Sequence, residues 1–298
     1  MSKKKEGINT LSFSDRLQGY RNDPLSFVLM MITYLATAVT MTVLLFVVIY
    51  ILVKGIPNLK PSLFDWKYTS DNVSMMPAII NTITITILSL MFSVPVGIGA
   101  AVYLCEYAKR GNKLVGIVRI TAETLTGIPS IVYGLFGALF FGTFLHLGTS
   151  LISGALTLAI MILPVIMRTT EEALLAVPDS YREGSYGLGA GRLRTIFRVI
   201  LPAAVSGIFS GIVLGIGRIA GESAALIYTA GTFAKVATTL HDSARTLSVH
   251  MYVLSGESLY VNEAYASAVM LLIVVLCINF ISGKIADKVA KGGTNGEN

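Results

Sequence analysis

Six long apolar stretches divide the chain, and polar segments with most of the charged residues separate them. A bilayer core of about 30 Å needs about 20 apolar residues in a helix, and backbone groups in lipid must bond within their own helix. The pattern therefore predicts six spanning helices, of which the third, rich in glycine and containing Pro129, is a candidate for a broken or tilted one. Their expected bounds are Phe27–Val53, Ala78–Leu104, Thr126–Leu147, Leu151–Met167, Ala203–Tyr228 and Ala264–Ile281.

The composition supports an all-α integral membrane protein. Of the 298 residues, 54% are hydrophobic and 13% are charged, whereas a soluble domain has about a quarter charged residues. The net charge of +6 does not indicate nucleic-acid binding, because no basic patch has a folded domain of its own. Cys105 and Cys277 have no metal or redox spacing, and the three histidines have no metal-ligand spacing. We therefore expect no metal and no cofactor.

Basic residues set the expected orientation. If the N-terminus is cytoplasmic, the inner segments hold 17 of the 23 Lys and Arg residues, the outer segments hold 5, and Arg218 lies inside a span. Cytoplasmic loops carry the excess of Lys and Arg in membrane proteins. The count predicts a multi-pass protein of the cell (inner or plasma) membrane with both termini in the cytoplasm.

The largest inner loop, residues 168–202, is long for a simple connection. Ser180 and Glu183 have the spacing of a capping box, which predicts a short helix that starts at Ser180. Glycine is favoured just past a helix end, so this helix should stop near Gly187 or Gly189. A second helix is expected over 192–201, ended by the proline that follows.

The same loop resembles the cytoplasmic signature of ABC importer permeases, which reads E-A-A, three residues, G, nine residues, I-x-L-P. Every spacing matches, and the departures are Gly184 and Ser185 for the two alanines and Val199 for isoleucine. The resemblance implies a short helix that docks into a groove on an ATP-binding subunit; the alternative is a loop that only caps its own helix. The chain has no G-x-x-x-x-G-K-[ST] phosphate loop, so ATP hydrolysis would belong to a partner. The implied coupling residues are Glu183, Gly184, Ser185, Gly189, Leu201 and Pro202.

Two charged residues, Arg218 and Glu222, lie inside the fifth span. A charge at the bilayer centre costs at least about 2.5–3.5 kcal/mol, so it usually faces a pathway or a partner. A guanidinium offers a bidentate fork suited to oxyanions, which makes both residues candidates for the substrate pathway. The alternative is a structural i,i+4 ion pair, and Glu222 could also hold Arg218 until an anion competes for it. Glycines spaced by four in this span predict close helix packing: Gly207, Gly211 and Gly215, and Gly217 with Gly221.

Further motifs extend the resemblance over about 78–282 and make it more selective. The segment resembles permeases of phosphate-specific ABC importers, of the PstA type. That family usually reads Arg-x-x-Gly-Glu-Thr-Ala-Pro-Leu in its fifth span, from which Ser223 and Ala224-Ala225 depart slightly. The matching residues are Asn81-Thr82, Pro95-Val96-Gly97, the run from Gly127 to Gly137 (GIPSIVYGLFG), Arg218-x-x-Gly221-Glu222 and Ala264-Tyr265-Ala266.

The resemblance implies a six-helix bundle of the ABC importer type I permease kind and a non-catalytic transport subunit. Implied partners are a dimer of ABC ATP-binding subunits, a second permease subunit of the PstC type, an extracytoplasmic phosphate-binding protein and the lipid bilayer. Expected segments are a cytoplasmic tail (1–26), the first span with an outer loop (27–76), the permease domain (77–283) and a cytoplasmic tail (284–298). Alternatives are a permease for another oxyanion or nutrient, and a non-ABC anion carrier that works alone.

Overall fold

The computed structural model describes residues 24–109 and 111–294, and the regular elements of this part of the chain are helices. Most of the expected N-terminal tail, 1–26, lies outside the described residues. Besides α-helices, the described residues form three π-helical segments (η3, η4, η5) and three 3₁₀ segments (η1, η2, η6). The elements are α2 (Pro24–Gly55), η1 (Ile56–Asn58), η2 (Pro61–Phe64), α3 (Met76–Val102), η3 (Tyr103–Tyr107), α4 (Lys113–Thr126), α5 (Ser130–Gly137), η4 (Ala138–Phe144), α6 (Leu151–Leu175), α7 (Asp179–Gly187), α8 (Arg192–Thr195), η5 (Ile196–Ile200), α9 (Leu201–Gly221), α10 (Ala224–Thr229), α11 (Leu247–Gly256), η6 (Ser258–Tyr260) and α12 (Val261–Thr294).

The chain divides into two compact units, residues 1–53 and 54–298. The described part of the first unit belongs to helix α2, whose last two residues fall in the second unit. Helix α2 has 32 residues and therefore a length of about 48 Å at 1.5 Å per residue. Its apolar stretch has a mean hydropathy of 2.6. This length and composition suit a membrane span, as the sequence predicts.

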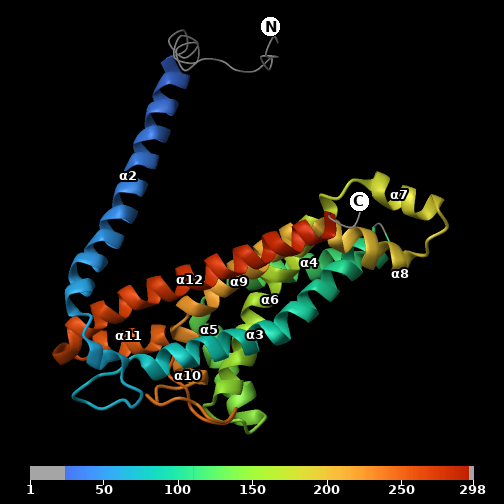
Figure 1. Cartoon of the computed structure of the whole chain (residues 1–298). Coiled ribbons are helices and arrows are strands. Elements are labelled where there is room, and N and C mark those ends of the chain that lie inside the picture. Colours follow the sequence, from blue (N-terminus) through green and yellow to red (C-terminus); the bar gives the residue numbers. More distant parts are fainter. Residues whose placement is uncertain (1–23, 110, 295–298) are drawn as a thin grey trace. The chain divides into compact units, whose positions relative to one another are not determined.

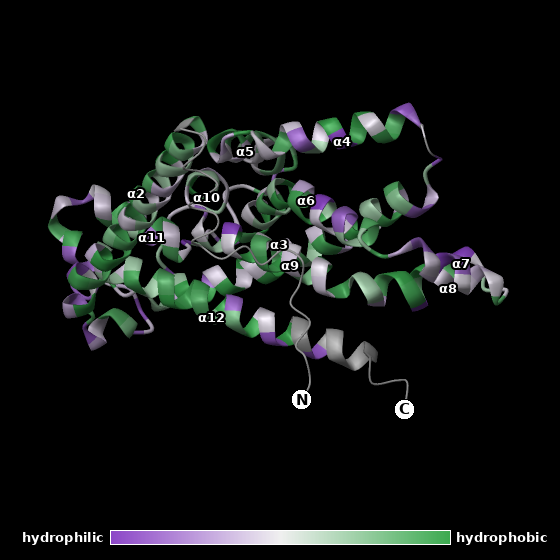
Figure 2. Ribbon diagram, turned by 90° about the horizontal axis from the view of Figure 1, so that it is seen from above, coloured by the Kyte–Doolittle hydropathy of each residue, from purple (hydrophilic) through white to green (hydrophobic). Residues whose placement is uncertain are grey.

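The second unit is built around four long helices. Helix α3 packs against α6, α6 packs against α9, and α9 packs against α12. Within this unit, Figure 1 shows α7 and α8 at one end of the long helices and α10 and α11 toward the other. Hydrophobic residues dominate α3, α9 and α12 in Figure 2, whereas hydrophilic residues are frequent in α7. The largest apolar core joins α3, α6 and α9 through fully buried side chains that include Ile85, Leu158, Ile162 and Ile219.

Glycines bring α9 close to α6. A Cβ on Gly207 would lie 2.5 Å from the Ala173 Cβ, and one on Gly211 would overlap the Thr169 hydroxyl. The predicted close packing is confirmed for this row. Within this chain, nothing lies within 4 Å of a Cβ added at Gly217 or Gly221, so this part of α9 has an open face.

The third predicted span, 126–147, is broken. Helix α4 ends at Thr126, and α5 starts at Ser130 with a bend of 103° between the two helices. Pro129 lacks a backbone N–H and disfavours helical backbone at Ile128, which explains the break. The Tyr133 hydroxyl donates to the Leu125 carbonyl oxygen across the bend at 2.7 Å. The apolar segment beyond the bend is α5 with η4, and it ends at Phe144.

The fifth predicted span, 203–228, differs at both ends. A continuous helical stretch runs from Arg192 to Gly221 through α8, η5 and α9, so the proline at 202 does not end a helix as expected. It lies in the first turn of α9, directly after the π-helical turn η5. Proline has no backbone N–H, and its ring crowds the carbonyl four positions earlier. The wider π-helical turn before it makes room for this ring. At the other end the helix breaks at Glu222, and α10 follows.

Other spans extend beyond their expected bounds. Helix α6 continues to Leu175, eight residues past Met167, because its charged residues find partners on α4. Arg168 pairs with Glu123 at 3.2 Å, and Glu171 pairs with Arg119. Helix α12 continues to Thr294, so the expected C-terminal tail is helical where it is described.

Candidate functional site

The predicted coupling helix is α7. It begins at Asp179, directly after Pro178, and no side chain caps it. The predicted capping box is therefore wrong: Ser180 lies inside the first turn, because the proline sets the helix start one residue earlier. The predicted end is confirmed, since α7 stops at Gly187. Gly189 follows with φ +80°, a backbone conformation that favours glycine.

The signature residues on α7 and after it face solvent. Glu183, Gly184 and Gly189 are exposed. Leu188, which the sequence does not single out, is 91% exposed. Ser185 instead contacts Thr195 of α8 through their hydroxyl oxygens at 2.8 Å.

The last two signature residues lie apart from α7. Leu201 and Pro202 begin α9, because the nine-residue spacer folds into α8 and η5. Leu201 is half-buried against the apolar cluster that contains Leu174 and Ile200, whereas Pro202 is exposed. The structure thus groups Glu183, Gly184, Ser185 and Gly189 at one end of the unit and separates the Leu-Pro pair from them.

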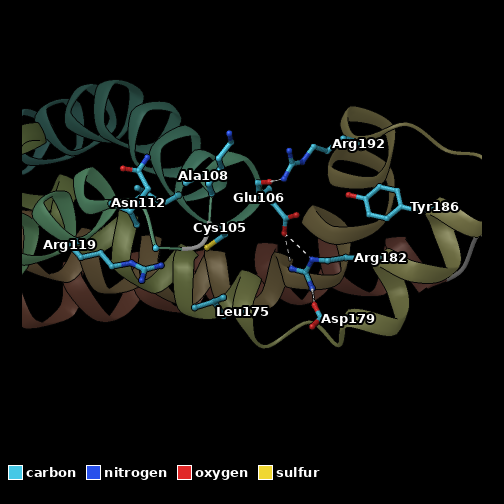
Figure 3. Close-up of a pocket in the computed structure, with 15 residues that line it drawn as sticks. Cys105, Glu106, Ala108, Asn112, Arg119, Leu175, Asp179, Arg182, Tyr186 and Arg192 are labelled. Carbon is cyan, nitrogen blue, oxygen red and sulfur yellow. Dashed lines mark hydrogen bonds and ion pairs between the residues drawn. The ribbon is translucent and has the colours of Figure 1, made fainter.

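Arg182 of α7 joins this helix to the end of α3, a contact that the sequence does not reveal (Figure 3). Its Nη2 lies 2.7 Å and its Nε 3.1 Å from Glu106 Oε1. The same guanidinium donates to the Leu174 carbonyl at 3.0 Å and the Val177 carbonyl at 2.9 Å, and it contacts the Asp179 carboxylate at 3.2 Å. The hydrogen bond to Glu106 raises the pKa of Arg182 above its ordinary value, so the side chain stays charged.

Arg192 reaches the same turn of the chain. Its Nη2 donates to the Glu106 carbonyl oxygen, and its guanidinium lies over the Tyr107 ring at 4.9 Å. Glu106, Arg182 and Arg192 line an open cavity of about 770 Å³ between η3, α4 and α7 (Figure 3). The only sequence signal for this cluster is that Glu106 is an acidic residue directly after an apolar run.

Arg218 and Glu222 do not pair. Glu222 has extended backbone, since α9 ends at Gly221, and its carboxylate accepts the Ala225 N–H of α10 at 3.0 Å. The alternative, a structural i,i+4 ion pair, is not formed, because it requires a continuous helix through Glu222. Arg218 is half-buried, and the structure gives it no hydrogen bond or ion pair with any described residue.

The helices that follow the two breaks, α5 and α10, contact each other. A Cβ on Gly134 of α5 would lie 2.8 Å from the Ala225 Cα of α10, and one on Gly137 would lie 2.8 Å from the Thr229 methyl group. Two glycines of the GIPSIVYGLFG motif therefore allow α5 to contact α10. Interrupted backbone at membrane depth is tolerated only where protein covers it or where it lines a water-filled cavity. At this junction protein covers it, because Gly134, Gly137 and Ala225 are buried.

Asn81, near the start of α3, holds the loop after α10. Its amide donates to the Lys235 carbonyl at 2.9 Å and the Arg245 carbonyl at 3.1 Å, and its carbonyl accepts the Ala237 N–H at 3.0 Å. Thr82 accepts the Leu247 N–H at 2.8 Å. The Asn-Thr pair that carries part of the resemblance thus fixes this loop to the second span.

Comparisons with known proteins agree with this arrangement. Residues 93–292 match the family described as "Binding-protein-dependent transport system inner membrane component". The chain is 30% identical to the "Probable ABC transporter permease protein YqgI" of Bacillus subtilis over 275 residues, which cover 86% of this chain and 93% of the relative. It is also 30% identical to the "Phosphate transport system permease protein PstA" of Haemophilus influenzae over 256 residues, which cover 84% of this chain and 90% of the relative.

Solved structures show the same fold. A chain of a bacterial alginate ABC transporter, crystallised with an alginate-bound periplasmic protein, aligns with a TM-score of 0.61 at 18% identity over 87% of this chain and 96% of its own. A chain of the MetNI methionine ABC transporter in an inward-facing conformation aligns with a TM-score of 0.55 at 22% identity over 72% of this chain and 94% of its own.

Proposed function

Because the chain belongs to the family of binding-protein-dependent transport system inner membrane components, as a permease subunit of an ABC importer, we propose that it carries inorganic phosphate into the cell. The similarity to PstA of Haemophilus influenzae supports this substrate. Arg218 is the residue that carries the assignment: an unpaired guanidinium near the end of a spanning helix is suited to a phosphate-like oxyanion.

The proposed pathway runs past the junction of the broken helices. With both termini in the cytoplasm, Arg218 lies in the outer half of the membrane, about 25 Å along the helix from Leu201. Glu222 supports this pathway by capping α10, which leaves the guanidinium free for the anion. The solute would thus meet Arg218 soon after it enters from outside.

Energy would come from a separate ABC ATP-binding subunit, which acts as a dimer. Helix α7 offers it an exposed surface with Glu183, Gly184, Gly189 and the apolar tip residue Leu188. The chain has no phosphate-binding loop of its own for ATP. This subunit is therefore proposed as non-catalytic.

Two further partners complete the proposed assembly. A second permease subunit of the PstC type would supply the other half of the pathway, next to the open face of α9 at Gly217 and Gly221. An extracytoplasmic phosphate-binding protein would deliver the anion to the loops after η1 and α10. The permease domain, 77–283, would follow the first span and its outer loop, 27–76, and precede the cytoplasmic tail, 284–298.

Uptake of labelled phosphate in cells that depend on this chain tests the proposal. Arg218→Ala should reduce uptake at least tenfold, and Arg218→Lys should restore little, because lysine keeps the charge but lacks the fork. Leu276→Ala, at an exposed position of α12 outside the proposed pathway, is the control. Near-normal uptake in Arg218→Ala would contradict the pathway role. Stronger competition by unlabelled sulfate or molybdate than by phosphate would assign another oxyanion.

A further inference from the structure

We propose that Glu106 and Arg182 form a clamp that passes movement of the coupling helix α7 to α3, and so keeps solute movement tied to ATP hydrolysis. This inference rests on the proposed function, because it needs a partner ATPase that moves α7. Neither residue belongs to the coupling signature. They act as positioning residues, since neither is placed to touch ATP or the solute.

The clamp is built from a buried carboxylate and a guanidinium with all three nitrogens engaged. The Glu106 side chain is 6% exposed and the Arg182 side chain is 16% exposed. Two of the three nitrogens of Arg182 reach one carboxylate oxygen of Glu106. Nη1 donates to the carbonyl of Val177, just after α6, and Nη2 also donates to the carbonyl of Leu174, in the last turn of α6. One side chain of α7 thus fixes both α3 and the end of α6.

Helix α7 contacts α8 and η5. It buries no residue of its own, so it lacks an apolar anchor against the long helices. Its other side-chain tie, Ser185 with Thr195, leads to α8 and not to α3. Among the side chains of α7 that the structure describes, Arg182 is the one that bonds directly to η3 at the end of α3.

The chemistry of the pair favours a transmitting role over a purely stabilising one. A buried ion pair adds little net stability compared with apolar residues of similar size, and its best-supported use is to fix geometry. An arginine fork has a defined direction, which a lysine does not. Glu106 also lies in the π-helical turn η3 at the end of α3, and such turns are frequent at functional sites. Arg192 holds the same turn through the Glu106 carbonyl.

The test uses the complete transporter, with this chain and its partners, in proteoliposomes that contain the binding protein. Phosphate uptake and ATP hydrolysis are measured together and expressed as phosphate moved per ATP. In Arg182→Lys and Glu106→Gln we expect assembly and ATP hydrolysis to remain, while this ratio falls at least tenfold. Asp179→Asn is the matched control, because Asp179 contacts the same guanidinium from an exposed position, and its ratio should stay within twofold of wild type.

Three results would overturn the clamp. The first is a wild-type ratio in both clamp variants. The second is a parallel loss of uptake and hydrolysis with the ratio unchanged, which would indicate a role in docking alone. The third is failure of both variants to co-purify with the ATPase, which would indicate a role in assembly. A wild-type complex that hydrolyses ATP without importing phosphate would instead contradict the proposed function, so the two failures are distinct.

Discussion

The contact between α9 and α6 allows a quantitative test in which one substitution is made at two glycines of the same helix. An alanine Cβ at Gly211 would overlap the Thr169 hydroxyl and lie 2.7 Å from the Thr169 Cβ, whereas at Gly217 it would meet nothing within 4 Å. Alanine gains about 0.8–1 kcal/mol of helix propensity over glycine at either position. Overpacking costs about 1–3 kcal/mol and applies only to Gly211→Ala. The free energies of unfolding of the two variants should therefore differ by about 1–3 kcal/mol, with Gly211→Ala the less stable.

The assay is reversible unfolding of the isolated chain in mixed micelles, titrated with a denaturing detergent and followed by circular dichroism. A second substitution makes this assay specific for the contact between Gly211 and Thr169. The Thr169 hydroxyl donates only to carbonyls of its own helix, Val165 at 2.9 Å and Ile166 at 3.2 Å. Removing it in Gly211→Ala/Thr169→Ala should recover part of the loss. Equal stability of Gly211→Ala and Gly217→Ala would refute the packing argument.

Three other predictions concern Gly189 after α7, Glu222 before α10 and His250 in α11. Gly189→Val should reduce uptake at least tenfold with membrane insertion intact, because φ +80° costs a β-branched residue about 1–2 kcal/mol or more. Gly189→Asn should retain most uptake, because asparagine tolerates this conformation. Equal uptake in the two variants would count against backbone strain at Gly189 as the cause. Glu222→Ala should lower thermal stability by about 1 kcal/mol, because the Ala225 N–H loses its acceptor. Glu222→Gln keeps an acceptor oxygen and should be more stable than Glu222→Ala. Identical melting of the two variants would exclude a capping role. Burial and the nearby Arg245 lower the pKa of His250 from 6.5 to about 4. Its folded state therefore resists protonation, and stability should be full above pH 6.5 and fall by up to about 3 kcal/mol toward pH 4; a variant His250→Phe with the same pH slope would contradict this.

The spans were predictable because they depend mainly on composition, whereas their ends depend on contacts. Helix α6 continues past Met167 through charged residues, since Arg168 and Glu171 find partners on α4. The break before Ser130 was open to prediction from its Gly and Pro residues. The break at Glu222 was not predicted, because no proline marks it and Gly221, directly before it, was assigned to close helix packing.

The candidate site was only partly visible in the sequence. The fixed spacing of the signature placed Glu183, Gly184 and Gly189 together correctly, because a short helix and its end are local features. Glu106 and Arg182 are 76 residues apart, and no local pattern links them. Arg218 was found as a charge in an apolar run, but its lack of a partner follows from the break at Glu222, which only the folded chain reveals.

The most direct test of the proposed function is phosphate import by purified components in proteoliposomes. The chain would be reconstituted alone, and then with its second permease subunit, ATP-binding subunits and binding protein, with labelled phosphate outside and ATP inside. We predict ATP-dependent phosphate accumulation only with the complete set, and none when a nonhydrolysable nucleotide replaces ATP. Phosphate transport by the chain alone, at the same rate with or without ATP, would contradict it.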